Sequence, residues 1–211
     1  MAKHAQNRHN QPRVFHYGLR RKIGLLGGSF NPAHEGHVAL SDKVRRAIKC
    51  DEIWWLVSPQ NPLKSSDDMA DFERRLSYAR ALVANKPFMK VIRLEQDIGT
   101  RFSYDSVRYI KSRAPRAQFY WLIGTDNLCQ LPHWHKAKAF TRLVPFIAVR
   151  RKDSFYQAVA SKGRAQFRCH SRVKQTPYLR ILSDFHAPQS ATSLRKNGFW
   201  QSHRSCGNSP S

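Results

Sequence analysis

The sequence has no long hydrophobic run. No apolar stretch approaches the roughly 18 residues that a membrane-spanning helix needs, and the basic segment from Met1 to Arg21 has no apolar core of a secretory signal. The four cysteines lie far apart and form no C-x-x-C pair, which indicates neither a disulfide framework nor a zinc knuckle: Cys50, Cys129, Cys169 and Cys206. These absences predict a cytoplasmic protein that does not act in a membrane.

Acidic residues are scarce in the second half of the chain. Residues 101–180 contain seventeen Lys and Arg but only three acids, and the 211-residue chain carries a net charge of +23. A surplus of this size attracts polyanions, whether nucleotides, nucleic acid or an anionic surface, without distinguishing among them. Hydrophobic residues still make up 41% of the sequence, which is enough for a core and excludes wholesale disorder.

The length fits one α/β domain. We predict a flexible basic extension over residues 1–21, a single domain over 22–200 and a polar tail over 201–211. Short apolar runs predict buried strands at 23–26, 53–57, 88–94, 119–123, 145–149 and 178–182. Apolar residues at helical spacing predict helices at 36–48, 67–83 and 103–112.

The alternation of strands and helices predicts the fold class. It favours a Rossmann-like, doubly wound, mostly parallel sheet with helices on both faces. In such sheets ligands bind beyond the carboxyl ends of the strands. We therefore expect the site at the loops that follow Leu26, Val57, Leu94 and Ile123.

The loop after the first predicted strand is the most unusual segment. It reads Gly27-Gly28-Ser29-Phe30-Asn31-Pro32-Ala33-His34-Glu35-Gly36-His37. Its glycines allow a ligand to approach the backbone, and its two histidines lie where a helix N-terminus favours anions, so the loop predicts phosphate binding. The H-x-x-H pair could also be half of a zinc site, but no third ligand is evident. Neither a Walker loop nor the dinucleotide fingerprint fits.

This loop resembles the G-G-S-F-D-P-x-H-x-G-H signature of the nucleotidyltransferase superfamily with the H-x-G-H motif, with Asn31 in place of Asp. Residues 190–195 (Ser-Ala-Thr-Ser-Leu-Arg) are similar to its S-S-T-x-I-R element. The resemblance implies nucleotidyl transfer to a phosphate acceptor with release of pyrophosphate. It implies catalytic roles for His34, His37 and Arg195. It also implies ATP binding by Gly27, Gly28, Ser29, Phe30, His34, His37, Gly124, Asp126, Ser190, Thr192 and Arg195.

Three middle segments resemble those of bacterial nicotinate-nucleotide adenylyltransferases. Residues 54–64 are similar to W-x-x-P-x-x-x-P-x-K, residues 99–106 to S-Y-T-x-x-T, and residues 124–134 to G-x-D-x-x-x-x-L-x-x-W. The resemblance implies adenylyl transfer from ATP to nicotinate mononucleotide, giving deamido-NAD in NAD biosynthesis. It implies mononucleotide binding by Lys64, Ser103, Tyr104 and Trp134. Mg²⁺ would bridge the ATP phosphates, with no metal site on the protein itself.

Two alternatives stay open at this point. A sister adenylyl- or cytidylyltransferase, such as one with a phosphopantetheine acceptor, would share the first and last motifs. A nucleic-acid-binding protein would explain the positive charge, but it would need basic residues interleaved with exposed aromatics, which the sequence does not present. The sequence also leaves open a homo-oligomer and the choice between nicotinate and nicotinamide mononucleotide.

Overall fold

The computed structural model describes residues 21–59, 69–150, 160–167, 176–182, 191–196 and 199–202. In chain order its elements are β1 (Lys22–Gly28), α1 (Glu35–Ile48), β2 (Glu52–Val57), α2 (Phe72–Leu82), β3 (Met89–Ile92), α3 (Leu94–Asp97), α4 (Ser103–Arg113), β4 (Gln118–Gly124), α5 (Thr125–Leu128), η3 (Leu131–His133), α6 (Ala137–Leu143), β5 (Phe146–Val149), η5 (Arg164–Gln166), β6 (Leu179–Leu182), α8 (Ala191–Lys196) and α9 (Phe199–Ser202). Each of the six predicted strands is present, with ends shifted by a few residues.

The strands form one sheet in the order β3-β2-β1-β4-β5-β6, and every neighbouring pair is parallel. In the centre of the sheet, Leu25 of β1 lies in register with Trp54 of β2 and Trp121 of β4. The order of connections reverses between β1 and β4, which is where a doubly wound sheet opens a crevice at its carboxyl edge. The predicted fold class is confirmed, with a sheet that is wholly parallel.

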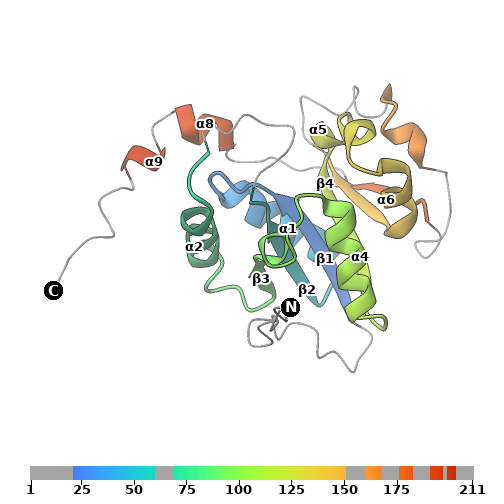
Figure 1. Ribbon diagram of the computed structural model, residues 1–211, viewed down its shortest axis with the longest axis horizontal. Coiled ribbons are helices and arrows are strands. Elements are labelled where there is room, and N and C mark those ends of the chain that lie inside the picture. The colour runs from blue at the N-terminus through green and yellow to red at the C-terminus, as the bar shows by residue number, and fades with distance from the viewer. Residues whose placement is uncertain are drawn as a thin grey trace, which may run out of the picture.

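Each face of the sheet has its own hydrophobic core, because successive side chains of a strand point to opposite faces. Trp55 of β2 and Leu122 of β4 belong to the core under α1 and α2, whereas Trp54 and Trp121 belong to the core under α4 and α6. Figure 1 shows α2 on one side of the sheet and α4 and α6 on the other. Trp54 and Trp55 are fully buried, as the sequence predicts for a core strand.

The observed helices differ from the predicted ones mainly at their ends. The predicted 67–83 helix begins at Phe72, because the Asp71 side chain accepts hydrogen bonds from the backbone N–H groups of Glu73 and Arg74 and so caps the first turn. The strand predicted over 88–94 ends at Ile92, and Leu94 opens the short helix α3. Helices α3, α5 and α6 were not predicted, since four to seven residues span too few turns to show a helical period.

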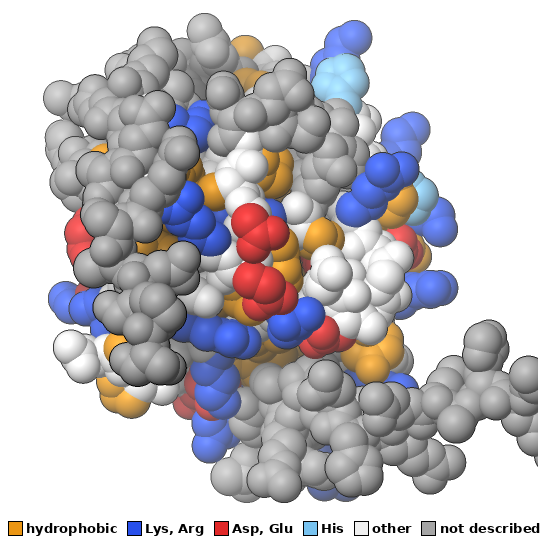
Figure 2. Space-filling view, turned by 60° about the vertical axis from the view of Figure 1, so that its left-hand side comes forward, with side chains coloured by type: hydrophobic (Ala, Val, Ile, Leu, Met, Phe, Trp, Pro, Cys, Tyr) orange, Lys and Arg blue, Asp and Glu red, His pale blue; other side chains and the backbone are white. Residues whose placement is uncertain are grey.

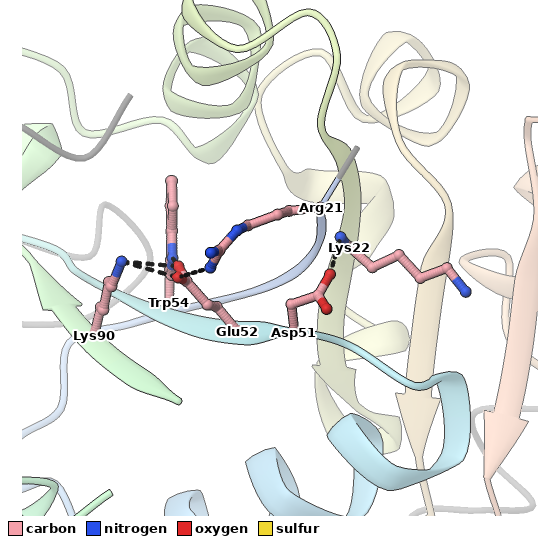
Figure 3. Close-up of polar contacts among 6 residues, drawn as sticks. All are labelled: Arg21, Lys22, Asp51, Glu52, Trp54 and Lys90. Atoms are coloured by element: carbon pink, nitrogen blue, oxygen red, sulfur yellow. Dashed lines mark hydrogen bonds and ion pairs between the residues drawn. The ribbon is translucent and has the colours of Figure 1, made fainter. Parts of the chain in front are cut away.

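The amino-terminal edge of the sheet carries an ion cluster around the buried Glu52. Glu52 accepts hydrogen bonds from Arg21 Nη1 at 2.8 Å, from Lys90 Nζ at 3.0 Å and from the Trp54 indole N–H at 2.7 Å (Figure 3). Its neighbour Asp51 accepts from the backbone N–H of Lys22 at 2.7 Å. These contacts satisfy the acids at the edge that lies away from the expected site.

The predicted basic extension and polar tail lie, but for Arg21, Gln201 and Ser202, outside the described residues. Within the part that is described, no helix has the length and apolar character needed to cross a membrane. On the face shown in Figure 2, acidic side chains gather near the centre and Lys and Arg side chains surround them.

Candidate active site

A cavity of about 310 Å³ opens at the carboxyl ends of the central strands. Its wall includes the segment that follows β1, the start of α1, the end of β4, the start of α4 and the loop around η3. Of the loops expected at the site, those after Leu26 and Ile123 supply several lining residues, and those after Val57 and Leu94 supply Ser58 and Glu95. The position agrees with the rule for doubly wound sheets.

The glycine-rich loop is held by aromatic rings. Gly27, Gly28, Ser29 and Phe30 all line the cavity. A Cβ on Gly27 would lie 2.8 Å from Cζ2 of Trp121, so this glycine is needed to make room for an indole ring. Packing therefore requires glycine here, in addition to the sequence prediction that the glycines let a ligand approach the backbone.

Phe30 turns the chain out of that loop. It has a φ of 47°, in the left-handed region, and its ring stacks on that of Trp55 at 4.8 Å between centroids. The His37 ring packs against both, with centroids 4.9 Å from Phe30 and 5.9 Å from Trp55. The buried Phe30 ring therefore helps to position His37, while its backbone redirects the chain.

The two predicted catalytic histidines lie side by side. His34 is the N-cap residue of α1 and His37 lies in its first turn, with ring centroids 3.9 Å apart. The backbone N–H of His34 donates to Nδ1 of His37 at 3.2 Å. A ring nitrogen that accepts a hydrogen bond carries no proton, so a neutral His37 ring keeps its proton on Nε2 and can donate from that atom. Both rings line the cavity.

The late helix α8 reaches the first loop through Arg195. Its Nη1 donates to the backbone carbonyl of Asn31 at 2.7 Å, across 164 residues of sequence. The Asn31 side-chain oxygen accepts from the indole N–H of Trp200 at 2.7 Å and from the backbone N–H of Ala70 at 3.2 Å. A carboxylate could accept the same two bonds, so Asn31 preserves the acceptor role of the Asp in the motif it resembles.

Aromatic side chains also line the cavity. Ser103, Tyr104 and Trp134 line it, as predicted for a mononucleotide site. Trp134 is half-buried and packs its ring edge-on against Trp121, with centroids 6.3 Å apart. Gly124 and Asp126, predicted to bind ATP, also line the cavity, where β4 gives way to α5.

Comparisons with known proteins agree with this arrangement. A model of the cytidylyltransferase-like family matches residues 25–197. The chain is 41% identical over 188 residues to a probable nicotinate-nucleotide adenylyltransferase of Parvibaculum lavamentivorans, covering 85% of this chain and 93% of that protein. It is 42% identical over 184 residues to one of Erythrobacter litoralis, covering 83% and 84%. The chain belongs to the nicotinate-nucleotide adenylyltransferases, within the cytidylyltransferase-like family.

A solved structure supports the fold of this family member. The Plasmodium falciparum nicotinic acid mononucleotide adenylyltransferase complexed with NaAD is similar with a TM-score of 0.67 at 20% sequence identity. The similarity covers 84% of this chain and 83% of that one. A similarity of that extent is not confined to the first motif.

Some predicted site residues of this adenylyltransferase cannot be placed. Lys64 and Ser190 lie outside the described residues. Thr192 lies in α8, and its side chain is not among those described. Its neighbour Ala191 lines the cavity, so the backbone at the start of α8 reaches the site. The structure therefore brings together the two histidines, the glycine-rich loop, Asp126, Tyr104 and Trp134, with Arg195 bonded to the same loop.

Arg75, which no motif in the sequence indicated, connects the loops of the site. The residue is 1% exposed, and its guanidinium donates to four backbone carbonyls: those of Ser29, Ser58, Pro59 and Ala70. Burial lowers the pKa of Arg75 from its ordinary value, and nearby Asp71 acts in the opposite direction. The group remains a cation, and no carboxylate of the described residues lies within ion-pair distance of it.

Glu95 and the residues Phe102 and His135 were also missed. Phe102 and His135 stack with ring centroids 4.2 Å apart and both line the cavity. Burial raises the pKa of Glu95 to about 7, although hydrogen bonds with Ser58 and Ser106 lower it in part. A carboxyl group that titrates near neutral pH in a cavity wall is a candidate for contact with a ligand.

Proposed function

We infer that this protein transfers the adenylyl group of ATP to nicotinate mononucleotide, producing deamido-NAD and pyrophosphate in NAD biosynthesis. The observation that carries the inference is 41% identity to a probable nicotinate-nucleotide adenylyltransferase over 93% of that protein's length. The cavity supports it, because two histidines, a glycine-rich loop and several aromatic rings line it together. The four cysteines are widely spaced and form no C-x-x-C pair, which favours a reducing, cytoplasmic setting.

The reaction is a displacement at the α-phosphorus of ATP. An oxygen of the acceptor's 5′-phosphate forms the new bond to the α-phosphorus, and the bond from that phosphorus to the bridging oxygen of the β-phosphate breaks. The electron pair leaves with pyrophosphate. The acceptor phosphate is already an anion near neutral pH, so no strong general base is required. Catalysis then depends on alignment and on neutralising charge at the oxygens around the α-phosphorus.

The residues that would hold ATP follow from their places in the cavity. His37 can donate from Nε2 to an α-phosphoryl oxygen, and His34 beside it can contact the same phosphate chain. Arg195, with the N–H groups around Thr192, would hold the β- and γ-phosphates. Gly27 to Phe30 would follow the triphosphate, and Asp126 at the end of β4 would contact the adenosine.

Mg²⁺ enters this scheme with ATP. A divalent ion bridging phosphate oxygens would neutralise charge on the triphosphate. In the described ranges no group of three or more His, Cys, Asp or Glu side chains is arranged to hold a metal ion. The residues that would contact MgATP are therefore the cationic and N–H donors named above.

The acceptor would lie beside the aromatic side chains of the cavity. Trp134 offers a ring face for the pyridine ring, and Ser103 and Tyr104 lie at the start of α4 beside it. Lys64 would hold the acceptor's phosphate.

The test is pyrophosphate release from ATP and Mg²⁺ with nicotinate mononucleotide, nicotinamide mononucleotide and phosphopantetheine as acceptors. Turnover with nicotinate mononucleotide is expected. Turnover with phosphopantetheine alone would support nucleotidyl transfer but would reject nicotinate mononucleotide as the acceptor.

A further inference from the structure

Glu95 is a buried carboxyl group whose hydrogen bonding is incomplete. Its side chain is 2% exposed and lines the cavity. The Ser106 hydroxyl donates to Oε1 at 3.3 Å, but Oε2 is buried with no hydrogen-bond partner among the described residues. Buried polar atoms normally have partners, and leaving one without costs stability.

The other buried glutamate shows what a purely structural carboxyl looks like in this chain. Glu52, at the opposite edge of the sheet, is 6% exposed and receives bonds from Arg21, Lys90 and Trp54 (Figure 3). No Lys or Arg of the described chain forms an ion pair with Glu95. Packing alone therefore does not explain Glu95, and an incoming ligand could complete its hydrogen bonding.

Glu95 contacts the start of α4, the segment that would hold the acceptor. Its carboxyl group interacts with Ser58, just past the end of β2, and with Ser106, in the second turn of α4. The Ser106 hydroxyl also lies 3.3 Å from the carbonyl of Phe102, directly before Ser103. The Ser58 backbone N–H donates to the carbonyl of Gly28 at 2.9 Å, so Glu95 lies between the glycine-rich segment and the start of α4, where Ser103 and Tyr104 would hold the mononucleotide.

We propose that Glu95 binds the acceptor mononucleotide, with Oε2 accepting a hydrogen bond from a ribose hydroxyl. The proposal rests on the proposed function, because it takes nicotinate mononucleotide as the acceptor. The pyridinium ring of that molecule has no N–H, and its carboxylate and ionised phosphate only accept hydrogen bonds. The two ribose hydroxyls are therefore its only donors, and a carboxylate oxygen is a strong acceptor for them.

Nicotinate mononucleotide and its 2′-deoxy and 3′-deoxy analogues test the proposal in kinetic assays with ATP. We compare the wild-type protein with Glu95→Met, which keeps the side-chain length and removes both oxygens. Gln96→Met, at the exposed neighbour on α3, is the matched control. The wild type and the control are expected to use one deoxy analogue about 10- to 100-fold less efficiently than nicotinate mononucleotide, measured as kcat/KM. For Glu95→Met, kcat/KM with nicotinate mononucleotide is expected to fall by the same factor. This variant should then use nicotinate mononucleotide and that deoxy analogue with equal efficiency, and its KM for ATP should not change.

Three results would overturn the proposal. In the first, the wild type uses both deoxy analogues as efficiently as nicotinate mononucleotide. In the second, Glu95→Met still discriminates against a deoxy analogue. In the third, Glu95→Met raises the KM for ATP and leaves the KM for the acceptor unchanged. If Glu95→Met does not fold, Glu95→Gln takes its place, with a smaller loss of discrimination expected because a neutral amide oxygen is a weaker acceptor. Absence of any turnover of nicotinate mononucleotide by the wild type is a separate result, and it would reject the proposed function itself.

Discussion

Replacing Glu95 with Gln should change how the stability of the protein depends on pH. Burial raises the pKa of this carboxyl to about 7 in the folded protein, whereas its ordinary value is 4.5. Between those two values the folded state holds a proton that the unfolded state has released. The free energy of unfolding therefore falls as the pH rises through this window and levels off above pH 7.

The magnitude follows from the size of the pKa shift. Each unit corresponds to about 1.4 kcal/mol, so the wild type should lose on the order of 3 kcal/mol through Glu95 between pH 4.5 and pH 8. Gln has nearly the same shape and does not titrate. At the low end of the window both side chains are neutral, so the difference between the two proteins should be small there. At pH 8 the Gln variant should be the more stable by about 3 kcal/mol.

Urea denaturation of both proteins at several pH values between 5 and 8.5 measures this difference. All other titrating groups contribute equally to the two curves, so the difference between them isolates Glu95. Gln96→Met, at the exposed neighbour on the same helix, changes no titrating group and is the control that should show no such trend. Parallel curves for the wild type and the Gln variant would refute the reasoning, since they would mean that Glu95 is already ionised near its ordinary pKa in the folded state.

Three further substitutions test the site and its supports. His37→Ala should lower kcat by at least about tenfold, and on the order of 10²–10³ for the loss of a charge-stabilising donor; an unchanged kcat in a folded variant would reject the role of Nε2. Arg75→Met should lower the free energy of unfolding by about 3 kcal/mol or more, because it leaves four carbonyls without their donor; Arg80→Met, exposed on the same helix, should have little effect in the same denaturation assay. Gly27→Ala should cost about 1–3 kcal/mol by crowding Trp121, and Trp121→Phe should recover part of that loss if the crowding is the cause.

The sheet could be predicted from the sequence because its strands are buried on both faces. Such strands appear as short continuous apolar runs, and the chain has six of them separated by helical or turn segments. The strand order could not be predicted from those runs, since nothing in an apolar pattern says which strand lies beside which. The short helices α3, α5 and α6 were missed for a different reason, because four to seven residues span too few turns to show a helical period.

The candidate site was predicted best where local sequence carries the chemistry. The His34 and His37 pair and the glycines occupy one loop, so their spacing alone indicates that they act together. The contact between Arg195 and Asn31 spans 164 residues, and only the resemblance to a known family predicted that those segments meet. Trp200, which donates to Asn31, lies beyond the motif and gave no signal at all.

Buried charge is the signal that would have found the missed residues. Arg75 lies one helical turn from Phe72 and from Ala79, on the apolar face of α2, and a cation on such a face must find acceptors inside the protein. Glu95 follows Leu94 beyond the carboxyl end of β3, where a doubly wound sheet binds ligands.

The hydrogen-bond partners of the two buried glutamates distinguish a structural role from a functional one. Glu52 is fully bonded at the amino-terminal edge, whereas Glu95 has one oxygen without a partner among the described residues at the carboxyl edge. A buried acid that costs stability at neutral pH and lies at the binding edge of the sheet is expected to repay that cost when substrate binds.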